Sequence, residues 1–333
     1  MFMSTKLQAG IATLLLALSV PAAHANRYAI EDLGLNVVPY DLNDKGDVAG
    51  AKNTKAIEFR AGRKNGLEFA ANGGAAVGVN ANGDAVGTLG LTPILWTRFG
   101  HRHVLALPGG ATIGDATSVA DNRTAVGTYV RSDDLEHEHC FRTLEDGTST
   151  DLGSFEHGGI CIPLAIDSAG DIIVGAASIG TPPFGAFQAF MWRDGVLADL
   201  GTLGGDASEA LGINSQGKIV GRATVSDGGA GHAFVWHQGK MKDIGTSSVF
   251  TDTSANAIND KGVIVGDAYP KDGRAVAARF AEGAVISLED EVVNLDDWGL
   301  VIAVAINNDG TIVGRGFRGS VDHSHGFLLR PLP

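Results

Sequence analysis

The stretch Ile213-Asn-Ser-Gln-Gly-Lys-Ile-Val-Gly221 recurs throughout the chain, and its recurrence decides the fold. Each copy has an aliphatic residue, a short polar turn that usually holds Asn and Gly, and a second aliphatic run that ends in Gly. Seven copies begin at residues 42, 79, 119, 166, 213, 258 and 306, so successive copies lie 37 to 48 residues apart. A period near 45 residues is typical of β-propeller blades and differs from the periods of leucine-rich or helical solenoids.

The sequence within each repeat predicts strands. Segments such as residues 218–225, KIVGRATV, are rich in β-branched residues, and the Asn and Gly between apolar runs suit a tight turn. The best preserved repeat divides into four strands, at residues 208–214, 218–225, 231–237 and 240–246. After residue 26 no segment has the apolar spacing of an amphipathic helix. We therefore predict an all-β fold, a seven-bladed β-propeller of four-stranded antiparallel blades.

The two ends of the chain complement each other. Residues 26–34, NRYAIEDLG, resemble the fourth strand of a repeat, whereas the last repeat ends after its third strand, at residues 323–331. Pairing of the N-terminal strand with the last blade would complete that blade and close the ring without an open edge. We predict that residues 26–333 form a single β-propeller domain of seven repeats of about 45 residues.

The chain begins with the pattern of a secretory signal peptide. Lys6 precedes an apolar run at residues 11–20, and Ala23-His24-Ala25 has the small residues of a cleavage site. We predict a signal peptide at residues 1–25 and a secreted mature protein, either periplasmic or extracellular. No apolar run approaches the ~18 residues that a membrane-spanning helix needs, so we expect no membrane insertion.

The composition is acidic, with 25 Lys and Arg against 38 Asp and Glu and a formal net charge of −13. Nucleic acid binding depends on clustered basic residues that neutralise phosphates. The charge balance therefore argues against nucleic acid as a partner. We expect the protein to be a monomer.

The repeat also resembles a known family. His232-Ala233-Phe234, the segment DLGTLGGD at residues 199–206 and the repeated pattern INxxGxIVG are similar to the extracellular His-Ala-Phe (HAF) repeat proteins of bacteria. The resemblance covers residues 27–330 and is strongest at residues 166–246. It implies a secreted, propeller-like repeat protein, and it brings no established reaction or catalytic residues to this chain.

One pair of polar residues recurs on the third and fourth strands of the repeats. If Gln238-Gly239 forms the turn, His232 lies diagonal to Asp243 on one face of the sheet. The equivalent pairs are Gln188 with Asp199, His139 with Asp151, and His325 with Asp32 of the N-terminal strand. One extra residue in the His139 repeat indicates a bulge. We interpret these pairs as hydrogen bonds within each blade, because partly buried polar groups need partners.

Metal binding is the alternative for these histidines. His139, His232 and His325 belong to different blades spread around the ring, so one ion could not bind all three. The His-x-His pairs are better candidates, because residues i and i+2 of a strand point to one face. These pairs are His101 with His103, His137 with His139 and His323 with His325. Two histidines do not complete a tetrahedral zinc site, so we expect neither a metal nor another cofactor.

Cys140 and Cys161 are the only two cysteines. An even count in an exported chain indicates a disulfide, here between the third strand of one blade and the start of the next blade. Two unpaired cysteines in adjacent blades are the alternative, because no feature of the sequence fixes their distance.

The sequence offers little evidence for catalysis. It has no nucleophile-elbow, zinc-protease or phosphate-loop motif. The acidic groups at residues 133–134, 289–291 and 296–297 could serve a glycosidase, although such groups are more often solvated loop charges. We therefore favour a binding or interaction module for a protein or glycan partner over an enzyme. The alternative is a hydrolase or lyase that acts on carbohydrate, with its site at the central channel.

Overall fold

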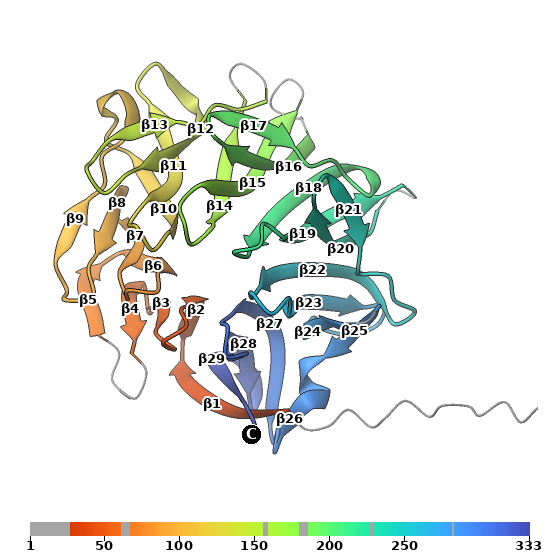
Figure 1. The fold of residues 1–333 in the computed structure, drawn as a ribbon. Coiled ribbons are helices and arrows are strands. Elements are labelled where there is room, and N and C mark those ends of the chain that lie inside the picture. Colours follow the sequence, from red (N-terminus) through yellow and green to blue (C-terminus); the bar gives the residue numbers. More distant parts are fainter. Residues whose placement is uncertain (1–26, 61–66, 156–158, 180–185, 227–228, 282) are drawn as a thin grey trace, which may run out of the picture.

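A computed structural model describes residues 27–60, 67–155, 159–179, 186–226, 229–281 and 283–333. Seven β-sheets stand around a central axis like the blades of a propeller, and each sheet presents one edge strand to that axis (Figure 1). All pairings within them are antiparallel except that of β26 (Val292–Val293) with β1 (Tyr28–Leu35). The predicted all-β, seven-bladed propeller is confirmed. The predicted signal peptide at residues 1–25 lies outside the described residues. None of the described helices is long and apolar enough to cross a membrane.

The first three blades are built in chain order from the axis outward. Blade 1 has β2 (Val37–Leu42), β3 (Val48–Lys52), β4 (Lys55–Phe59) and β5 (Leu67–Asn72). Blade 2 has β6 (Gly74–Val79), β7 (Ala85–Leu89), β8 (Thr92–Trp96) and β9 (Arg102–Val104). The short 3₁₀ helix η1 (Pro108–Gly110) leads into blade 3, with β10 (Gly114–Val119), β11 (Ala125–Arg131), β12 (Asp134–Thr143) and β13 (Ser149–Asp151).

The next three blades repeat this order. Blade 4 has β14 (Cys161–Ile166), β15 (Ile172–Ile179), β16 (Ala186–Arg193) and β17 (Val196–Asp199). Blade 5 has β18 (Gly204–Ile213), β19 (Ile219–Val225), β20 (Gly231–His237) and β21 (Lys240–Asp243). Blade 6 has β22 (Phe250–Ile258), β23 (Ile264–Pro270), β24 (Val276–Ala281) and β25 (Ala284–Ser287).

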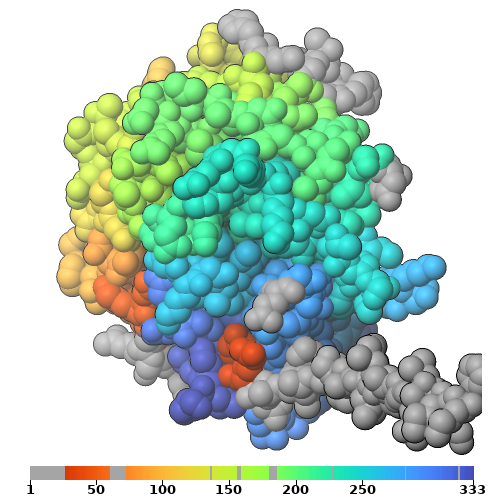
Figure 2. Space-filling model, turned by 45° about the vertical axis from the view of Figure 1, so that its right-hand side comes forward, coloured from red at the N-terminus to blue at the C-terminus, as the bar shows by residue number. Residues whose placement is uncertain are grey.

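Blade 7 combines both ends of the chain. After η2 (Leu288–Glu291) and β26 (Val292–Val293), its inner strands are β27 (Trp298–Ile306), β28 (Ile312–Arg318) and β29 (Ser320–Pro331). The N-terminal β1 (Tyr28–Leu35) pairs antiparallel with β29, from Tyr28 opposite Pro331 to Leu35 opposite His325. Figure 2 shows these N-terminal residues in red beside the blue C-terminal strands. The ring therefore closes by pairing of the termini, and β26 adds a fifth strand outside β1.

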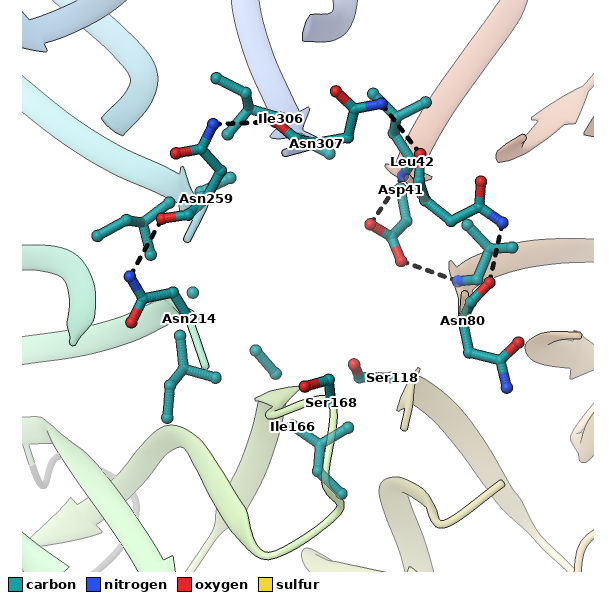
Figure 3. Close-up of a pocket in the computed structure, with 18 of the residues that line it drawn as sticks. Asp41, Leu42, Asn80, Ser118, Ile166, Ser168, Asn214, Asn259, Ile306 and Asn307 are labelled. Carbon is teal, nitrogen blue, oxygen red and sulfur yellow. Dashed lines mark hydrogen bonds between the residues drawn. The ribbon is translucent and has the colours of Figure 1, made fainter. Parts of the chain in front are cut away.

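The turn between the first two strands of each blade explains the repeated Asn-x-x-Gly. In blade 5, Asn214 Oδ1 accepts hydrogen bonds from the backbone N–H groups of Gln216 and Lys218, at 3.1 and 3.0 Å. Gly217 then adopts a left-handed backbone with φ of 69°, which costs glycine little. These turns surround one end of the axis (Figure 3).

The core of the best preserved blades is built around one buried phenylalanine on the third strand. Phe141, Phe190, Phe234 and Phe327 are fully buried. Each follows a small residue that lies against the next blade. The Ala189 N–H donates to Ser208 Oγ at 2.9 Å, and the Ala233 N–H donates to Thr253 Oγ1 at 2.9 Å. A Cβ added at Gly326 would lie only 3.0 Å from Val37 Cγ1, so a small residue is needed there.

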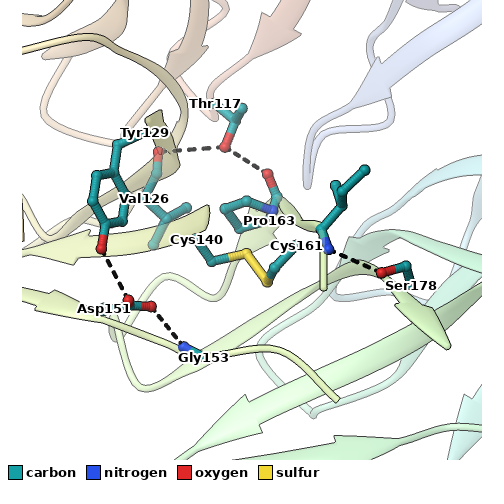
Figure 4. Close-up of a disulfide and its surroundings, with 10 residues drawn as sticks. Thr117, Val126, Tyr129, Cys140, Asp151, Gly153, Cys161, Pro163 and Ser178 are labelled. Atoms are coloured by element: carbon teal, nitrogen blue, oxygen red, sulfur yellow. Dashed lines mark hydrogen bonds between the residues drawn. A yellow bond between two sulfur atoms is a disulfide. The ribbon is translucent and has the colours of Figure 1, made fainter. Parts of the chain in front are cut away.

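The disulfide occupies this same position between blades 3 and 4. Cys140 precedes Phe141, as Ala189 precedes Phe190, and Cys161 stands six residues before Asp167, as Ser208 stands six before Asn214. Cys140 and Cys161 form a disulfide with their Cα atoms 5.2 Å apart (Figure 4). The predicted disulfide is confirmed. It replaces the hydrogen bond that joins the equivalent positions of blades 4 and 5 and of blades 5 and 6.

Deletion of residues 26–34 should destabilise the mature chain. Tyr28 is buried in the core of blade 7, and loss of a buried aromatic residue alone costs about 3 kcal/mol or more. The control is Glu31→Ala, which removes an exposed carboxylate from the same strand and should change the free energy of unfolding by less than about 1 kcal/mol. Equal urea unfolding curves for the deletion and the full mature chain would contradict closure by β1.

The double variant Ala189→Cys/Ser208→Cys should form a second disulfide during oxidative refolding. Its two positions match Cys140 and Cys161 in the blade, and the hydrogen bond between them already holds the two strands together. Mass spectrometry without reductant checks the result, with each single variant as the control that retains a free thiol. Two free thiols in the double variant would show that the positions are not equivalent.

Candidate functional site

A cavity of about 400 Å³ lies on the propeller axis, at the end where the Asn-x-x-Gly turns meet. All seven blades contribute the last residues of their inner strands and the turns that follow (Figure 3). Among the described residues that line it are four aspartates and no Lys, Arg or His. The central channel is therefore acidic at its mouth.

A bulge in each inner strand supplies the wall of this channel. The register of β2 shifts between Pro39 and Asp41, and the inner strands of the other blades shift at the equivalent point. As a result, two consecutive residues of most blades line the cavity. The first of the two is Tyr40, Val77, Thr117, Leu164, Leu211, Asn256 or Val304. The second is Asp41, Ser118, Ala165, Gly212, Ala257 or Ala305. Most of this wall is aliphatic or small.

The asparagines of the turns form an interblade belt around the mouth. In five blades the side-chain amide of the turn asparagine donates to the backbone carbonyl at the equivalent position of the next blade. The bonds run from Asn43 to Asn80 O (2.9 Å), Asn80 to Ala120 O (3.0 Å), Asn214 to Asn259 O (3.1 Å), Asn259 to Asn307 O (2.9 Å) and Asn307 to Asn43 O (3.2 Å). The last of these bonds joins blade 7 to blade 1, where the two ends of the ring meet.

The carboxylates at the rim of the channel also form hydrogen bonds between neighbouring blades. Asp121 Oδ1 accepts from the Ala81 N–H at 2.8 Å, and Asp260 Oδ1 accepts from the Ser215 N–H at 2.9 Å. Asp44 Oδ1 accepts from the Asn308 N–H at 2.8 Å. Burial raises the pKa of Asp260, but its hydrogen bonds from Ser215 and Asn308 outweigh that effect and hold it below the usual value. All three rim carboxylates accept a backbone hydrogen bond across a seam between blades.

Asp41 is the one acidic residue in the two rows of wall residues. Its Oδ1 accepts from the Leu42 N–H at 2.8 Å, and its Oδ2 accepts from the Val79 N–H of blade 2 at 2.8 Å. Burial nevertheless raises the pKa of Asp41 to about 6, because two hydrogen bonds compensate only part of the lost hydration. Asp41 therefore changes charge near neutral pH inside the channel.

The recurrent polar pairs lie at the outer part of the blades, away from the channel lining. His232 Nδ1 lies 2.7 Å from Asp243 Oδ2, and His325 Nδ1 lies 3.0 Å from Asp32 Oδ1. With its amide nitrogen turned toward Asp199, Gln188 donates to Asp199 Oδ2 at 2.8 Å. Burial raises the pKa of Asp243, but hydrogen bonds from His232, Gly245 N–H and Thr246 lower it below its ordinary value.

The predicted pair of His139 with Asp151 is wrong. Asp151 Oδ2 accepts from the Tyr129 hydroxyl at 2.9 Å, and His139 Nε2 instead lies 3.2 Å from Asp134 Oδ2. The residues opposite Gln188, His232 and His325 on the second strand are Ala177, Ala223 and Gly316. Tyr129 stands at this position in blade 3, and its larger side chain takes the place of the histidine. The tyrosine was visible in the sequence as a departure from the small residue of other repeats.

The remaining candidate residues are spread over several blades. His137 Nδ1 contacts Asp134 Oδ1 at 2.8 Å, and His325 is paired with Asp32. Within the described ranges no group of three or more His, Cys, Asp and Glu is placed to hold a metal ion. In the acidic segments, Asp133 pairs with Arg131, Glu291 with Arg279, and Asp297 with Arg318. The structure does not bring these acids together in the channel.

No protein-family model and no curated protein matches this chain. Several solved structures are similar to it. Streptogramin B lyase has 14% identity and a TM-score of 0.54, over 93% of this chain and 100% of that one. Catalytically inactive virginiamycin B lyase from Staphylococcus aureus with quinupristin has 14% identity and a TM-score of 0.56, over 92% and 100%. The β-propeller domain of the trilobed protease from Pyrococcus furiosus has 10% identity and a TM-score of 0.56, over 89% and 98%. At these identities the likeness shows the propeller fold alone.

Asp243→Ala should lower the free energy of unfolding by about 1 to 2 kcal/mol at pH 7, as expected for hydrogen bonds to a partly exposed carboxylate. Because the pKa of Asp243 is lower in the folded state, its contribution is present above the ordinary value of 3.8 and is lost as pH falls through the folded-state pKa. Urea unfolding at pH 7 and pH 3 should show the difference between variant and parent shrinking in acid. A constant difference would contradict this account of the pair.

Proposed function

We propose that this protein is an exported binding module that receives a protein or glycan partner at the acidic mouth of its central channel. The proposal rests on the hydrogen bonds that the carboxylates at this mouth accept. Asp44, Asp121 and Asp260 all accept hydrogen bonds from neighbouring blades, so they shape and charge the mouth without forming an acid and base pair. The wall below them is mostly aliphatic, which suits burial of a ligand group.

Export is supported by the signal-peptide pattern of residues 1–25 and by the disulfide, which persists in oxidising compartments. We further propose membership of the HAF repeat family. In support, the three residues of His232-Ala233-Phe234 have separate structural roles. The first pairs with Asp243, the second meets the next blade and the third fills the core. The acidic mouth argues against nucleic acid, and we propose a monomer without membrane insertion or a cofactor.

One observation favours a second candidate function, a hydrolase or lyase that acts on carbohydrate in the channel. The pKa of Asp41 is raised to about 6, a value that suits proton transfer near neutral pH. Glycoside hydrolysis requires a second carboxyl group across the scissile bond, and Asp41 is the one carboxylate among the described wall residues. Turnover of a polysaccharide panel that is lost in Asp41→Asn would establish this alternative.

Blocking the channel should abolish binding of partners found in a screen against envelope proteins and glycans. Val77→Trp places a large ring in the wall of the channel, whereas Val196→Trp places the same ring on an exposed outer strand. We expect at least a tenfold loss of affinity for the first variant and no loss for the second, measured by calorimetry. Equal affinity of both variants and the parent would reject the channel mouth as the binding site.

A further inference from the structure

One residue of each inner strand directs its backbone N–H and C=O groups toward the channel. In an antiparallel pair both groups of a residue point to the partner strand or both point away, and successive residues alternate. The Asn259 N–H donates to Val263 O on the second strand at 3.1 Å. The N–H and C=O groups of Ile258, one residue earlier, therefore point away from the second strand and into the cavity that Ile258 lines. Ile306 holds the same place in blade 7, beside a turn with the same bond.

An aspartate shows what such groups bind. Leu42 and Val79 hold the equivalent positions in blades 1 and 2, and their N–H groups both donate to the Asp41 carboxylate. Its Oδ1 accepts from Leu42 and its Oδ2 accepts from Val79, both at 2.8 Å (Figure 3). The N–H groups of two neighbouring blades thus lie close enough together for one small planar group to bridge them.

The seam between blades 6 and 7 has the same construction without the carboxylate. Asn259 Nδ2 donates to Asn307 O at 2.9 Å, and the seam between blades 1 and 2 has the equivalent bond at the same length. Ala257 stands where blade 1 has its aspartate, and its methyl group borders the cavity. Among the described residues, the N–H groups of Ile258 and Ile306 have no hydrogen-bond acceptor. Two donors therefore face the cavity with room between them.

The other seams match the Asp41 arrangement less well. Asp41 already bonds to at least one N–H group at every seam that involves blade 1 or blade 2. Between blades 5 and 6 there is less room, because a Cβ added at Gly212 would lie 3.1 Å from Asn256 O. At the two seams of blade 4, Ala120 and Asp167 lack the side-chain amide that sets the geometry elsewhere. The seam between blades 6 and 7 is therefore the best candidate for a ligand.

The charge of the channel selects an uncharged ligand group. Aspartates and no basic residue are found among the described lining residues, so a further anion is repelled. Burial raises the pKa of Asp41 to about 6 in spite of its two N–H bonds, so these donors alone do not compensate a buried carboxylate for its lost hydration. A cationic ammonium group has no acceptor for an N–H donor. The ligand group must be a neutral acceptor.

An acetamido group fits better than a peptide strand. A peptide that adds to a sheet edge needs free N–H and C=O groups at every second residue of that edge. Bulges interrupt this pattern just below the mouth, between Ala255 and Ala257 in β22 and between Ala303 and Ala305 in β27. An acetamido group needs a single pair of donors for its oxygen and one carbonyl for its N–H. Its methyl group suits a wall that includes Val304.

We infer that the seam between blades 6 and 7 is a subsite for the acetamido group of an N-acetylated sugar, whose oxygen accepts from the N–H groups of Ile258 and Ile306. The two lone pairs of a carbonyl oxygen allow both bonds. This inference rests on the proposed binding function and assigns its partner to glycans that carry N-acetyl groups.

The test is an NMR titration of the mature chain with methyl N-acetyl-β-D-glucosaminide, followed at the backbone amides of Ile258 and Ile306. We expect saturable downfield shifts of both amide protons, as new hydrogen bonds form. Methyl β-D-glucoside has a hydroxyl in place of the acetamido group, and we expect it to bind at least about tenfold more weakly, as the loss of two hydrogen bonds predicts.

Substitution of Ala257 tests the site itself. Ala257→Asp supplies the carboxylate that blade 1 already has, so it should occupy both donors and weaken the sugar at least about tenfold. Ala257→Val fills the same space without charge and should also weaken binding. Ala284→Asp makes the same change on the exposed outer strand of blade 6 and should leave affinity unchanged. Melting curves identify any variant that has lost its fold.

The opposite results overturn the inference. These are no shift at the two amides, equal binding of the glucoside, and parent-like affinity in folded Ala257→Asp or Ala257→Val. Stronger binding of acetyl-Gly-Gly-amide than of the N-acetyl sugar would assign the seam to a peptide. A partner from the envelope screen that binds Ala257→Asp unchanged, yet not Val77→Trp, would reject this subsite and leave the proposed channel function standing.

Discussion

The fold depends on an asparagine side chain that forms hydrogen bonds at both of its ends. In blade 5 the carbonyl oxygen of Asn214 fastens the turn of its own blade, and its amide crosses to the backbone of blade 6. An aspartate could do only the first of these and an alanine neither, since only the amide group combines an acceptor with donors. Each propeller blade contacts only its neighbours, so a bond repeated at five of the seven seams between blades helps to hold the ring together. At about 1 kcal/mol each, such bonds matter through their number.

Farther from the axis, a second contact between neighbouring blades recurs around the ring. The small residue before the core phenylalanine lies against the next blade, and the contact there is a hydrogen bond at Ala189 and Ala233 and a disulfide at Cys140. The disulfide closes a loop of 21 residues, worth about 3 kcal/mol in the chain-entropy model, at a seam that lacks the asparagine bond. At the last seam, strand β1 completes blade 7 and covers the edge of β29. Every blade thus has two neighbours.

Much of this architecture could be predicted from the sequence, because the copies of the repeat show both the length of a blade and the positions at which a blade differs from the others. Seven copies predicted seven blades, and the complementary ends predicted closure by residues 27–34. The amide bonds between blades were not predicted, because a sequence shows that asparagine suits a turn and does not show which carbonyl lies beside its second end. The pairing of Tyr129 with Asp151 was not predicted. His139 was assigned to Asp151 from the pattern of the third and fourth strands, without regard to Tyr129, which lies opposite His139 on the second strand. Asp41 could not be assigned to the channel from the sequence, because the bulge of β2 that places it there was not predicted.

Asparagine side chains at the mouth of the channel hydrogen-bond across five of the seams between blades. The most direct test of this account is the free energy of unfolding of Asn259→Asp at pH 7. This variant retains the oxygen that accepts from Val263 N–H and loses the amide that reaches Asn307 O. The account predicts a loss of about 1 to 3 kcal/mol. A variant as stable as the parent would contradict the role of the asparagine belt.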